Sequence, residues 1–397
     1  MSNARTLDNL ARSGMSLMNR TIQRIGILTS GGDAPGMNAA IRAAFRRLKA
    51  CSKDNEVVLF REGLNGLAGR LEVNHLSEIN RSDLRGIIHR GGTFIGTGRI
   101  PELKPAPADC PDPDAWEKRR QEITDVAVVN LRQLRLSGVI VLGGDGSFKG
   151  MDHIRRAYEV RYNEPLRLVG IPATIDNDIW GTDASIGFDT ALNSTVDALR
   201  KLRDTCESHR RCAILEVMGN SSGWLALAAG IAGGATTLMI PERPETYDIE
   251  LVLARVRAAV RLNYRSIVIV MAEGVRKSSG YKDLPDRLRE LIENDDKIRQ
   301  YQGGRSLETR VNIIGYIARG GQPTAADNLL ASELGFEAAN AVTDESLTNP
   351  VMIAIQRGQL TRVAFDEVVR NSPRLVEETS PMVTVARSLL ISADQDF

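Results

Sequence analysis

Short apolar runs that end in a glycine-rich turn and continue into a helix-like stretch recur in this sequence. Ile22–Leu28 leads into T-S-G-G-D-A-P-G-M-N at residues 29–38 and then into Ala39–Leu48. Gly138–Leu142 leads into G-G-D-G-S at residues 143–147, which is again followed by a helical pattern. Such a unit places the free N–H groups of a helix N-terminus at the turn, where they can bind a phosphate. Continuous apolar strands of this kind are typical of parallel sheets covered on both faces.

Strands and helices alternate along the rest of the chain. Further strands are predicted at Glu56–Phe60, Leu166–Ile171, Cys212–Val217, Thr237–Ile240, Ser266–Ala272 and Val311–Ile314, with a hairpin at Val351–Gln356 and Leu360–Phe365. Helices are predicted at Ile123–Leu134, Asp189–Asp204, an alanine-rich stretch ending at Ile231, Ile249–Leu262, Pro285–Glu293, Ala326–Leu334 and Glu337–Thr343. This alternation predicts an α/β fold whose ligands bind at the carboxyl ends of the strands.

An acidic loop follows one of these strands. I-P-A-T-I-D-N-D-I-W-G-T-D occupies residues 171–183, and Pro172 ends the strand because proline cannot donate to a ladder. Asp176, Asp178 and Asp183 fall within eight residues. Carboxylates this close repel one another, bind a cation or act on protons. A solvated, turn-rich loop is the alternative, but the glycine turns at other strand ends favour one shared active site.

Composition excludes several classes of function. The 397 residues are 42% hydrophobic, which is ample for a core, and two domains are expected at this length. Lys and Arg number 51 against 50 Asp and Glu, so no long-range attraction to nucleic acid or acidic membranes is expected. No apolar run approaches the roughly 18–20 residues that span a bilayer. The four cysteines and four histidines lack zinc-site spacing, and so few cysteines suit a reducing cytoplasm.

One more glycine cluster and two polar segments need interpretation. R-G-G-T-F-I-G-T-G-R at residues 90–99 is hard to explain by packing alone, and Arg99 could meet a phosphate with its forked donors. Residues 101–118 are proline-rich and acidic, which predicts a surface insertion. Residues 1–20 are predicted to be a floppy or docked extension rather than a transit peptide.

Five motifs resemble those of the 6-phosphofructokinase family, in order and spacing, over roughly residues 22–340. The motifs are Gly31–Asn38, Gly143–Ser147, Thr174–Asp178 with Gly181–Asp183, Glu216–Gly219 and Arg319–Gly321. The resemblance implies two Rossmann-like three-layer α/β/α domains with mostly parallel sheets and the active site in the cleft between them. It implies a larger donor-binding domain at 22–187 plus 318–368, carrying the insertion 101–118. A smaller sugar-phosphate-binding domain is expected at 188–317 plus 369–397, after an N-terminal extension at 1–21.

The resemblance also implies the chemistry. Asp176 is expected to be the general base for the 1-hydroxyl of fructose 6-phosphate, while Thr174 and Asp178 orient the sugar and the transferred phosphoryl group. Asp145 is expected to bind Mg²⁺. The expected donor-site residues are Gly32, Arg99, Gly146 and Ser147. The expected sugar-phosphate residues are Thr174, Asp176, Met218, Gly219, Glu273, Tyr316 and Arg319 of one subunit, with Arg211 and Arg310 from a neighbour, which implies a homotetramer.

Several positions bear on the phosphoryl donor. Family members that use pyrophosphate carry Asp where this chain has Gly146 and Lys where it has Ala173, so both positions resemble the ATP-dependent type. Asn220 stands where the family usually has an arginine near the transferred phosphate, and Tyr316 replaces a common histidine. The alternatives are therefore a pyrophosphate-dependent enzyme, a kinase for another sugar phosphate, or a catalytically weak regulatory paralogue that binds sugar phosphates.

Regulation is expected to be altered. Arg42, Arg46, Arg81 and Arg203 fall where bacterial relatives bind the phosphates of effectors such as ADP or phosphoenolpyruvate. Thr236, Leu262 and Tyr264 replace a glutamate and two lysines there, which predicts weakened allostery. The expected partners are fructose 6-phosphate and a nucleotide, with no nucleic acid and no membrane, and the expected location is the cytoplasm.

Overall fold

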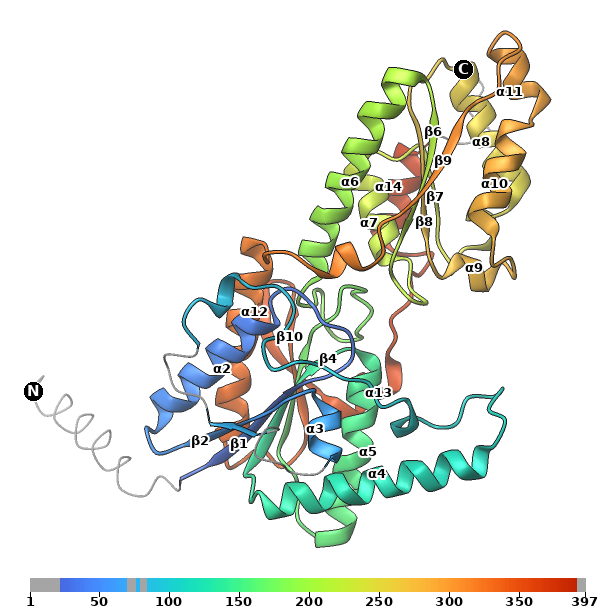
Figure 1. The fold of residues 1–397 in the computed structure, drawn as a ribbon. Helices are drawn as coiled ribbons and strands as arrows, with labels where there is room; N and C mark the ends of the chain where they lie inside the picture. Colours follow the sequence, from blue (N-terminus) through green and yellow to red (C-terminus); the bar gives the residue numbers. More distant parts are fainter. Residues whose placement is uncertain (1–21, 70–75, 79–83, 391–397) are drawn as a thin grey trace, which may run out of the picture.

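Two β-sheets organise the computed structural model, which describes residues 22–69, 76–78 and 84–390 (Figure 1). The larger sheet has the strand order β11-β10-β5-β4-β1-β2-β3. Its strands are β1 (Arg24–Thr29), β2 (Glu56–Phe60), β3 (Leu76–Glu78), β4 (Gly138–Gly143), β5 (Leu168–Pro172), β10 (Val351–Gln356) and β11 (Gln359–Ala364). The five inner strands are parallel, and the antiparallel pairs lie at the two edges. The predicted α/β architecture is therefore confirmed.

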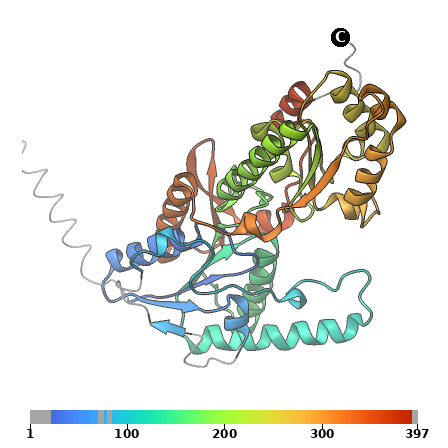
Figure 2. The same cartoon turned by 45° about the horizontal axis from the view of Figure 1, so that its top comes forward.

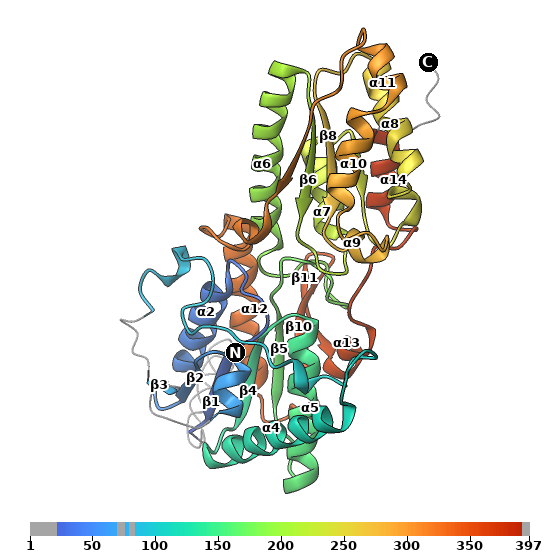
Figure 3. The ribbon, with the colours of Figure 1, turned by 45° about the vertical axis from the view of Figure 1, so that its right-hand side comes forward.

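Helices cover both faces of the larger sheet because its strands are apolar on both sides. Along β4, Ile140 packs into one core cluster, while Val139 and Val141 pack into another on the opposite face. One face carries α2 (Met37–Cys51) and α12 (Ala325–Thr343), and the other carries α3 (Leu64–Ala68), α4 (Pro113–Gln133), α5 (Asp145–Tyr162) and α13 (Phe365–Asn371) (Figures 1 and 3). Burial from both sides favours a parallel sheet.

The smaller sheet is wholly parallel, with the strand order β7-β8-β6-β9. Its strands are β6 (Cys212–Val217), β7 (Thr237–Met239), β8 (Ile267–Ala272) and β9 (Thr309–Ile313). The helices α6 (Phe188–His209), α7 (Trp224–Gly233) and α14 (Pro381–Leu389) lie on one side, and α8 (Ile249–Arg261), α10 (Leu284–Glu293) and α11 (Asp296–Tyr301) on the other (Figure 1). Short helices complete the architecture at α9 (Val275–Ser278), η1 (Ile87–His89), η2 (Pro101–Leu103), η3 (Pro244–Thr246) and η4 (Gly315–Arg319).

Three helix predictions are wrong at their boundaries, the simplest being Asp189–Asp204, which continues to His209 in α6. The sequence predicts a break between Leu334 and Glu337, but α12 runs through it. Gly335 marks a close approach rather than a break, because a Cβ there would collide with the carbonyl oxygen of Ala40 on α2. The helix predicted from Ile123 begins ten residues earlier, where the side chain of Asp112 accepts a hydrogen bond from the backbone of Ala115. The insertion 101–118 therefore includes the first turns of α4.

The carboxyl ends of the strands in the two sheets point toward each other, and the acidic loop lies between them (Figure 1). The chain passes from one sheet to the other after β5, after β9 through η4, and after α13 (Figure 1). Residues 1–20 lie outside the described residues, and the domain boundaries remain a prediction. None of the helices in the described part of the chain is both long and apolar enough to cross a bilayer.

Candidate active site

A cavity of about 620 Å³ lies where the carboxyl ends of both sheets meet. Most of the predicted site residues line it: Gly32, Arg99, Asp145, Gly146, Ser147, Thr174, Asp176, Asp178, Met218, Glu273, Tyr316 and Arg319. Segments separated by almost 300 residues thus converge on one site. That convergence supports the rule that ligands of α/β sheets bind beyond the carboxyl ends of the strands.

The acidic loop is held in a fixed conformation at the floor of this cavity. Asn177 has a positive φ of 50° and its side-chain oxygen accepts a hydrogen bond from the backbone of Ser185 at 3.0 Å. The hydroxyl of Ser185 donates to the carbonyl of Thr174 at 2.7 Å, and the hydroxyl oxygen of Thr174 accepts from the N–H of Asp176 at 3.2 Å. Asp183, by contrast, is exposed and accepts from the backbone of Arg357 at 2.6 Å. Asp176 and Asp178 therefore belong to the cavity, whereas Asp183 has a structural role in the loop.

Burial raises the pKa of both site carboxylates. The pKa of Asp176 is raised chiefly by desolvation, with Arg319 and Arg99 opposing and Glu273 adding to the shift. Its Oδ1 is buried and makes no hydrogen bond with the described residues. Burial, followed by repulsion from Asp176 and Asp145, raises the pKa of Asp178 to about 7. A carboxylate with a raised pKa is a stronger base for a hydroxyl proton than an exposed one.

This shift predicts that the stability of the ligand-free protein falls as pH rises. The Asp178 carboxyl has a pKa of 3.8 in the unfolded chain and of about 7 in the folded protein. The folded protein therefore keeps this proton at pH values where the unfolded chain has lost it, and folding is favoured while the proton is bound. Between pH 5 and pH 8 the unfolding free energy of the wild type should therefore fall by about 3 kcal/mol more than that of the Asp178→Asn variant. Urea titrations at both pH values measure this difference, and equal pH dependence in the two proteins would contradict it.

The carboxylates also fit a divalent cation. Within the described residues, no group of three or more histidine, cysteine or acidic side chains could hold a metal ion on its own. Mg²⁺ is commonly held by one or two carboxylates together with substrate phosphates, so such a group is not required. Asp145 already attracts a cation, because its carboxylate pairs with the ammonium of Lys149 at 2.7 Å. A cation beside Asp145 would also relieve its repulsion of Asp178.

Backbone and guanidinium groups form a cradle for anions in the middle of the cavity. A Cβ built on Gly32 would lie 2.5 Å from Arg319 Nη1 and 3.1 Å from Arg99 Nη2, so both guanidinium groups approach the same glycine turn. A Cβ on Gly146, at the N-terminus of α5, would lie 2.6 Å from the ammonium of Lys104. Three cations and a helix N-terminus therefore converge on these two turns, which favours binding of phosphates.

The smaller sheet supplies the other end of the cavity. Glu273, at the end of β8, accepts hydrogen bonds from the N–H groups of Gly219 (3.2 Å) and Asn220 (2.7 Å). This contact orders the turn that carries Met218, although Gly219 itself does not line the cavity. Asn220 does line it, with a φ of 52°, a left-handed conformation that asparagine adopts more readily than arginine. Tyr316 lines it while remaining 82% exposed.

Other predicted residues lie away from the cavity. Arg211 pairs with Glu308 at 2.6 Å, and Arg310 is exposed and pairs with the same carboxylate. Arg203 donates to the carbonyl of Gly233 at 2.8 Å. The predicted effector residues Arg42 and Arg46 are close enough that burial and then their mutual repulsion lower the pKa of Arg42. Arg81 lies outside the described residues, and a single chain does not test the proposed contacts between subunits.

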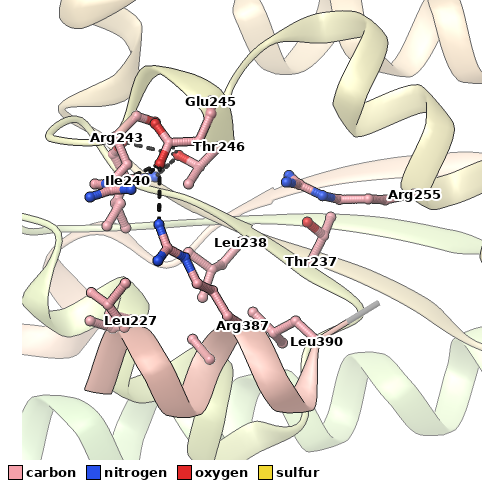
Figure 4. A pocket seen from close by; sticks show the side chains of 12 residues that line it. Leu227, Thr237, Leu238, Ile240, Arg243, Glu245, Thr246, Arg255, Arg387 and Leu390 are labelled. Carbon is pink, nitrogen blue, oxygen red and sulfur yellow. Dashed lines mark hydrogen bonds and ion pairs between the residues drawn. The ribbon is translucent and has the colours of Figure 1, made fainter. Parts of the chain in front are cut away.

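A second cavity, of about 320 Å³, lies beside β7 at the edge of the smaller sheet (Figure 4). Its floor is apolar, and its rim carries Arg243 and Arg387. Both guanidinium groups pair with Glu378 at 2.9 Å, and Arg243 also binds Glu245 at 2.7 Å. These charges are already matched, and none of the predicted site residues that the structure describes line this cavity.

Arg374 is a residue that positions the acidic loop and that the sequence did not reveal. Its guanidinium donates to the carbonyls of Asn177 (3.1 Å) and Thr182 (3.2 Å), and its N–H donates to the carbonyl of Asp178 at 2.5 Å. The same guanidinium lies 4.8 Å from the ring of Trp224 at the start of α7. Arg374 therefore ties the acidic loop to the smaller sheet's helices. Nothing in the local sequence indicates this, because its partners lie 150 or more residues away.

Comparisons with known proteins agree with this geometry. A family model described as Phosphofructokinase matches residues 24–342. The chain is 36% identical over 357 residues to an ATP-dependent 6-phosphofructokinase of Macrococcus caseolyticus, covering 90% of this chain and 97% of the relative. It is 42% identical over 315 residues to the ATP-dependent 6-phosphofructokinase of Bacillus subtilis, covering 79% and 84%.

Solved structures share the fold. The T-state crystal structure of Pichia pastoris phosphofructokinase is similar with a TM-score of 0.73 and 31% identity over 89% of this chain, which spans only 36% of the Pichia chain. A pyrophosphate-dependent phosphofructokinase from Marinobacter aquaeolei has a TM-score of 0.71 at 21% identity, covering 94% of this chain and 92% of that one. The latter likeness concerns the fold alone. With a family model over most of its length and close relatives over nearly all of it, this chain belongs to the phosphofructokinase family.

Proposed function

We propose that this protein transfers the γ-phosphoryl group of ATP to the 1-hydroxyl of fructose 6-phosphate, giving fructose 1,6-bisphosphate and ADP. The observation that carries the proposal is the position of Asp176, a carboxylate with a raised pKa, in one cavity with Arg99 and Arg319. The names of the bacterial relatives support ATP as donor. Phosphoryl transfer needs a positioned nucleophile and stabilised charge, and this site offers both.

Each of these residues has its own role in the proposed reaction. Asp176 accepts the proton of the 1-hydroxyl, and Thr174 orders the backbone that carries Asp176. Arg99 and Arg319 stabilise negative charge on the transferred group. Asp145 would hold Mg²⁺, which when bound neutralises charge on the donor phosphates. Asp178, through its raised pKa, would respond to that same cation.

Gly146 and Ala173 support ATP over pyrophosphate. The ammonium of Lys104 occupies the space above Gly146, so an aspartate there would have to displace it or pair with it. Ala173 is buried and brings no cation toward a short donor. The enzyme should therefore form fructose 1,6-bisphosphate with MgATP and not with magnesium pyrophosphate. Coupled assays with both donors in parallel test this, and activity with pyrophosphate alone would overturn the assignment of donor.

A regulatory paralogue is the second candidate, favoured by Asn220 in place of the expected arginine. The paired guanidinium groups of Arg99 and Arg319 weigh against it, because two phosphate-directed cations remain. Failure to form product with either donor, in a folded protein that binds fructose 6-phosphate, would favour this second candidate.

Assembly and location form part of the proposal. A homotetramer would let Arg211 and Arg310 reach a neighbour's 6-phosphate, which suits the exposure of Arg310. Arg42, Arg46 and Arg203 would then form a weakened effector site. The domains would divide at 22–187 plus 318–368 and at 188–317 plus 369–397. The four cysteines, none of which forms a disulfide in the structure, suit the cytoplasm.

The Arg374→Met variant should lower kcat by about 10- to 100-fold, with the KM for fructose 6-phosphate changed less than threefold. The substitution leaves the carbonyls of Asn177 and Thr182 without their donor and loosens the loop that carries Asp176. Arg374→Lys keeps one donor and should recover part of the loss. Steady-state kinetics and thermal melting of both variants measure this. A kcat that falls only in proportion to the folded fraction would show a purely structural role.

A further inference from the structure

The insertion 101–118 has a role beyond that of a surface loop. It contributes Pro105, Pro107 and Trp116 to the wall of the active-site cavity, next to Lys104. The loop between η2 and α4 projects from the larger sheet on the side of α5 (Figure 2). These three residues therefore line the cavity from the larger sheet's side, whereas Met218, Asn220 and Glu273 line it from the smaller sheet's side.

The chemistry of the cavity changes along its length. Glu273 and Asp176 offer carboxylates toward the smaller sheet, and the glycine turns in the middle offer N–H groups and the cations of Arg99, Arg319 and Lys104. The insertion end offers proline rings, the apolar side chains of Leu64 and Ile100, and one indole ring. A sugar phosphate suits the first region and a phosphate chain the second. The part of a donor that suits the third is a flat, uncharged ring.

Trp116 is held in place for such a contact. Its indole N–H donates to the carbonyl of Lys104 at 3.0 Å, which joins the two ends of the insertion. It lies in the first turn of α4, which Asp112 caps. Trp116 is half-buried, whereas its neighbours Ala115 and Glu117 are exposed. A ring that is fixed before the ligand arrives loses little conformational entropy on binding.

We propose that Trp116 is a specificity-determining residue against which the nucleobase of the donor stacks, so that the insertion favours a nucleotide over an inorganic phosphate donor. The inference rests on the proposed function and refines it. The proposed contact with the nucleobase is also coupled to the phosphate region of the cavity. The carbonyl that orients Trp116 belongs to Lys104, whose ammonium lies above Gly146.

Binding of two probes tests the inference. Isothermal titration calorimetry of the full chain with MgADP and with magnesium tripolyphosphate separates the base from the phosphates. Trp116→Ala should weaken MgADP about tenfold, in the range that base–aromatic stacking gives, and leave tripolyphosphate within twofold. Trp116→Phe, which keeps a ring, should stay within about threefold of the wild type for MgADP. Glu117→Ala, a neighbour that pairs with Arg120, is the matched control and should change neither.

Other outcomes would overturn the inference. Unchanged MgADP affinity in Trp116→Ala would show that the base lies elsewhere. An equal loss for both probes would show that Trp116 acts only by holding Lys104 in place. Thermal melting confirms that each variant is folded, and Trp116→Phe retains the test if the alanine variant is not. The proposed function fails separately, if the wild type makes no fructose 1,6-bisphosphate from ATP while binding MgADP in a Trp116-dependent manner.

Discussion

Replacing Asp176 by asparagine is expected to lower kcat for fructose 1,6-bisphosphate formation by about 10³-fold, within the range for a lost general base. The amide keeps the shape and can still contact a hydroxyl, but it cannot accept the hydroxyl proton. KM values should change little, because the cations that bind phosphates remain. Burial that raises the pKa of Asp176 makes its ionised form costly, so the variant should melt at the same temperature as the wild type or above it.

Asp183→Asn is the matched control, since it makes the same change in the same loop. Asp183 is exposed and binds the backbone of Arg357, so its loss should leave kcat within about twofold. Single-turnover measurements with MgATP would separate the chemical step from product release. Comparable activity in Asp176→Asn and the wild type would remove Asp176 from the reaction, and it would favour the regulatory paralogue if both activities were very low.

The contiguous motifs could be interpreted from the sequence because their chemistry is local. Asp176 and Asp178 lie two residues apart at the end of an apolar run, and the turns at Gly31–Gly32 and Gly143–Gly146 end neighbouring parallel strands. Parallel strand ends meet at one edge of a sheet, so the juxtaposition of these motifs follows from the fold class. The resemblance then supplied the roles of single residues such as Met218, which spacing alone would place in the core.

Long-range partners could not be predicted in this way. Arg374 binds carbonyls almost 200 residues away, and backbone carbonyls leave no signature in a sequence. Trp116 lies in a segment whose prolines and acids predict only exposure, and its contact with the cavity depends on where α4 begins. The break predicted between Leu334 and Glu337 is absent for a related reason: a glycine such as Gly335 that admits a neighbouring helix looks the same in sequence as one that ends a helix.

The second large effect is expected at Arg319. Arg319→Met should lower kcat/KM for fructose 6-phosphate by about 10²- to 10³-fold, the loss seen when one charge-stabilising donor is removed from such a site. Arg319→Lys keeps the charge without the planar fork and should recover only part of this. Arg305→Met, at an exposed arginine that does not line the cavity, is the control and should leave kcat/KM unchanged.

A double variant of Arg99 and Arg319 tests whether the two cations act on the same group. Both guanidinium groups approach the same glycine turn, so the effects of Arg99→Met and Arg319→Met should not be additive in the double variant. Because Asn220 offers no cation of its own, the proposed stabilisation of the transferred phosphoryl group would depend on this pair. Losses that simply add, or a loss below tenfold at Arg319, would mean that the two cations act on different phosphates. The charge that Asn220 does not supply would then have to come from Lys104.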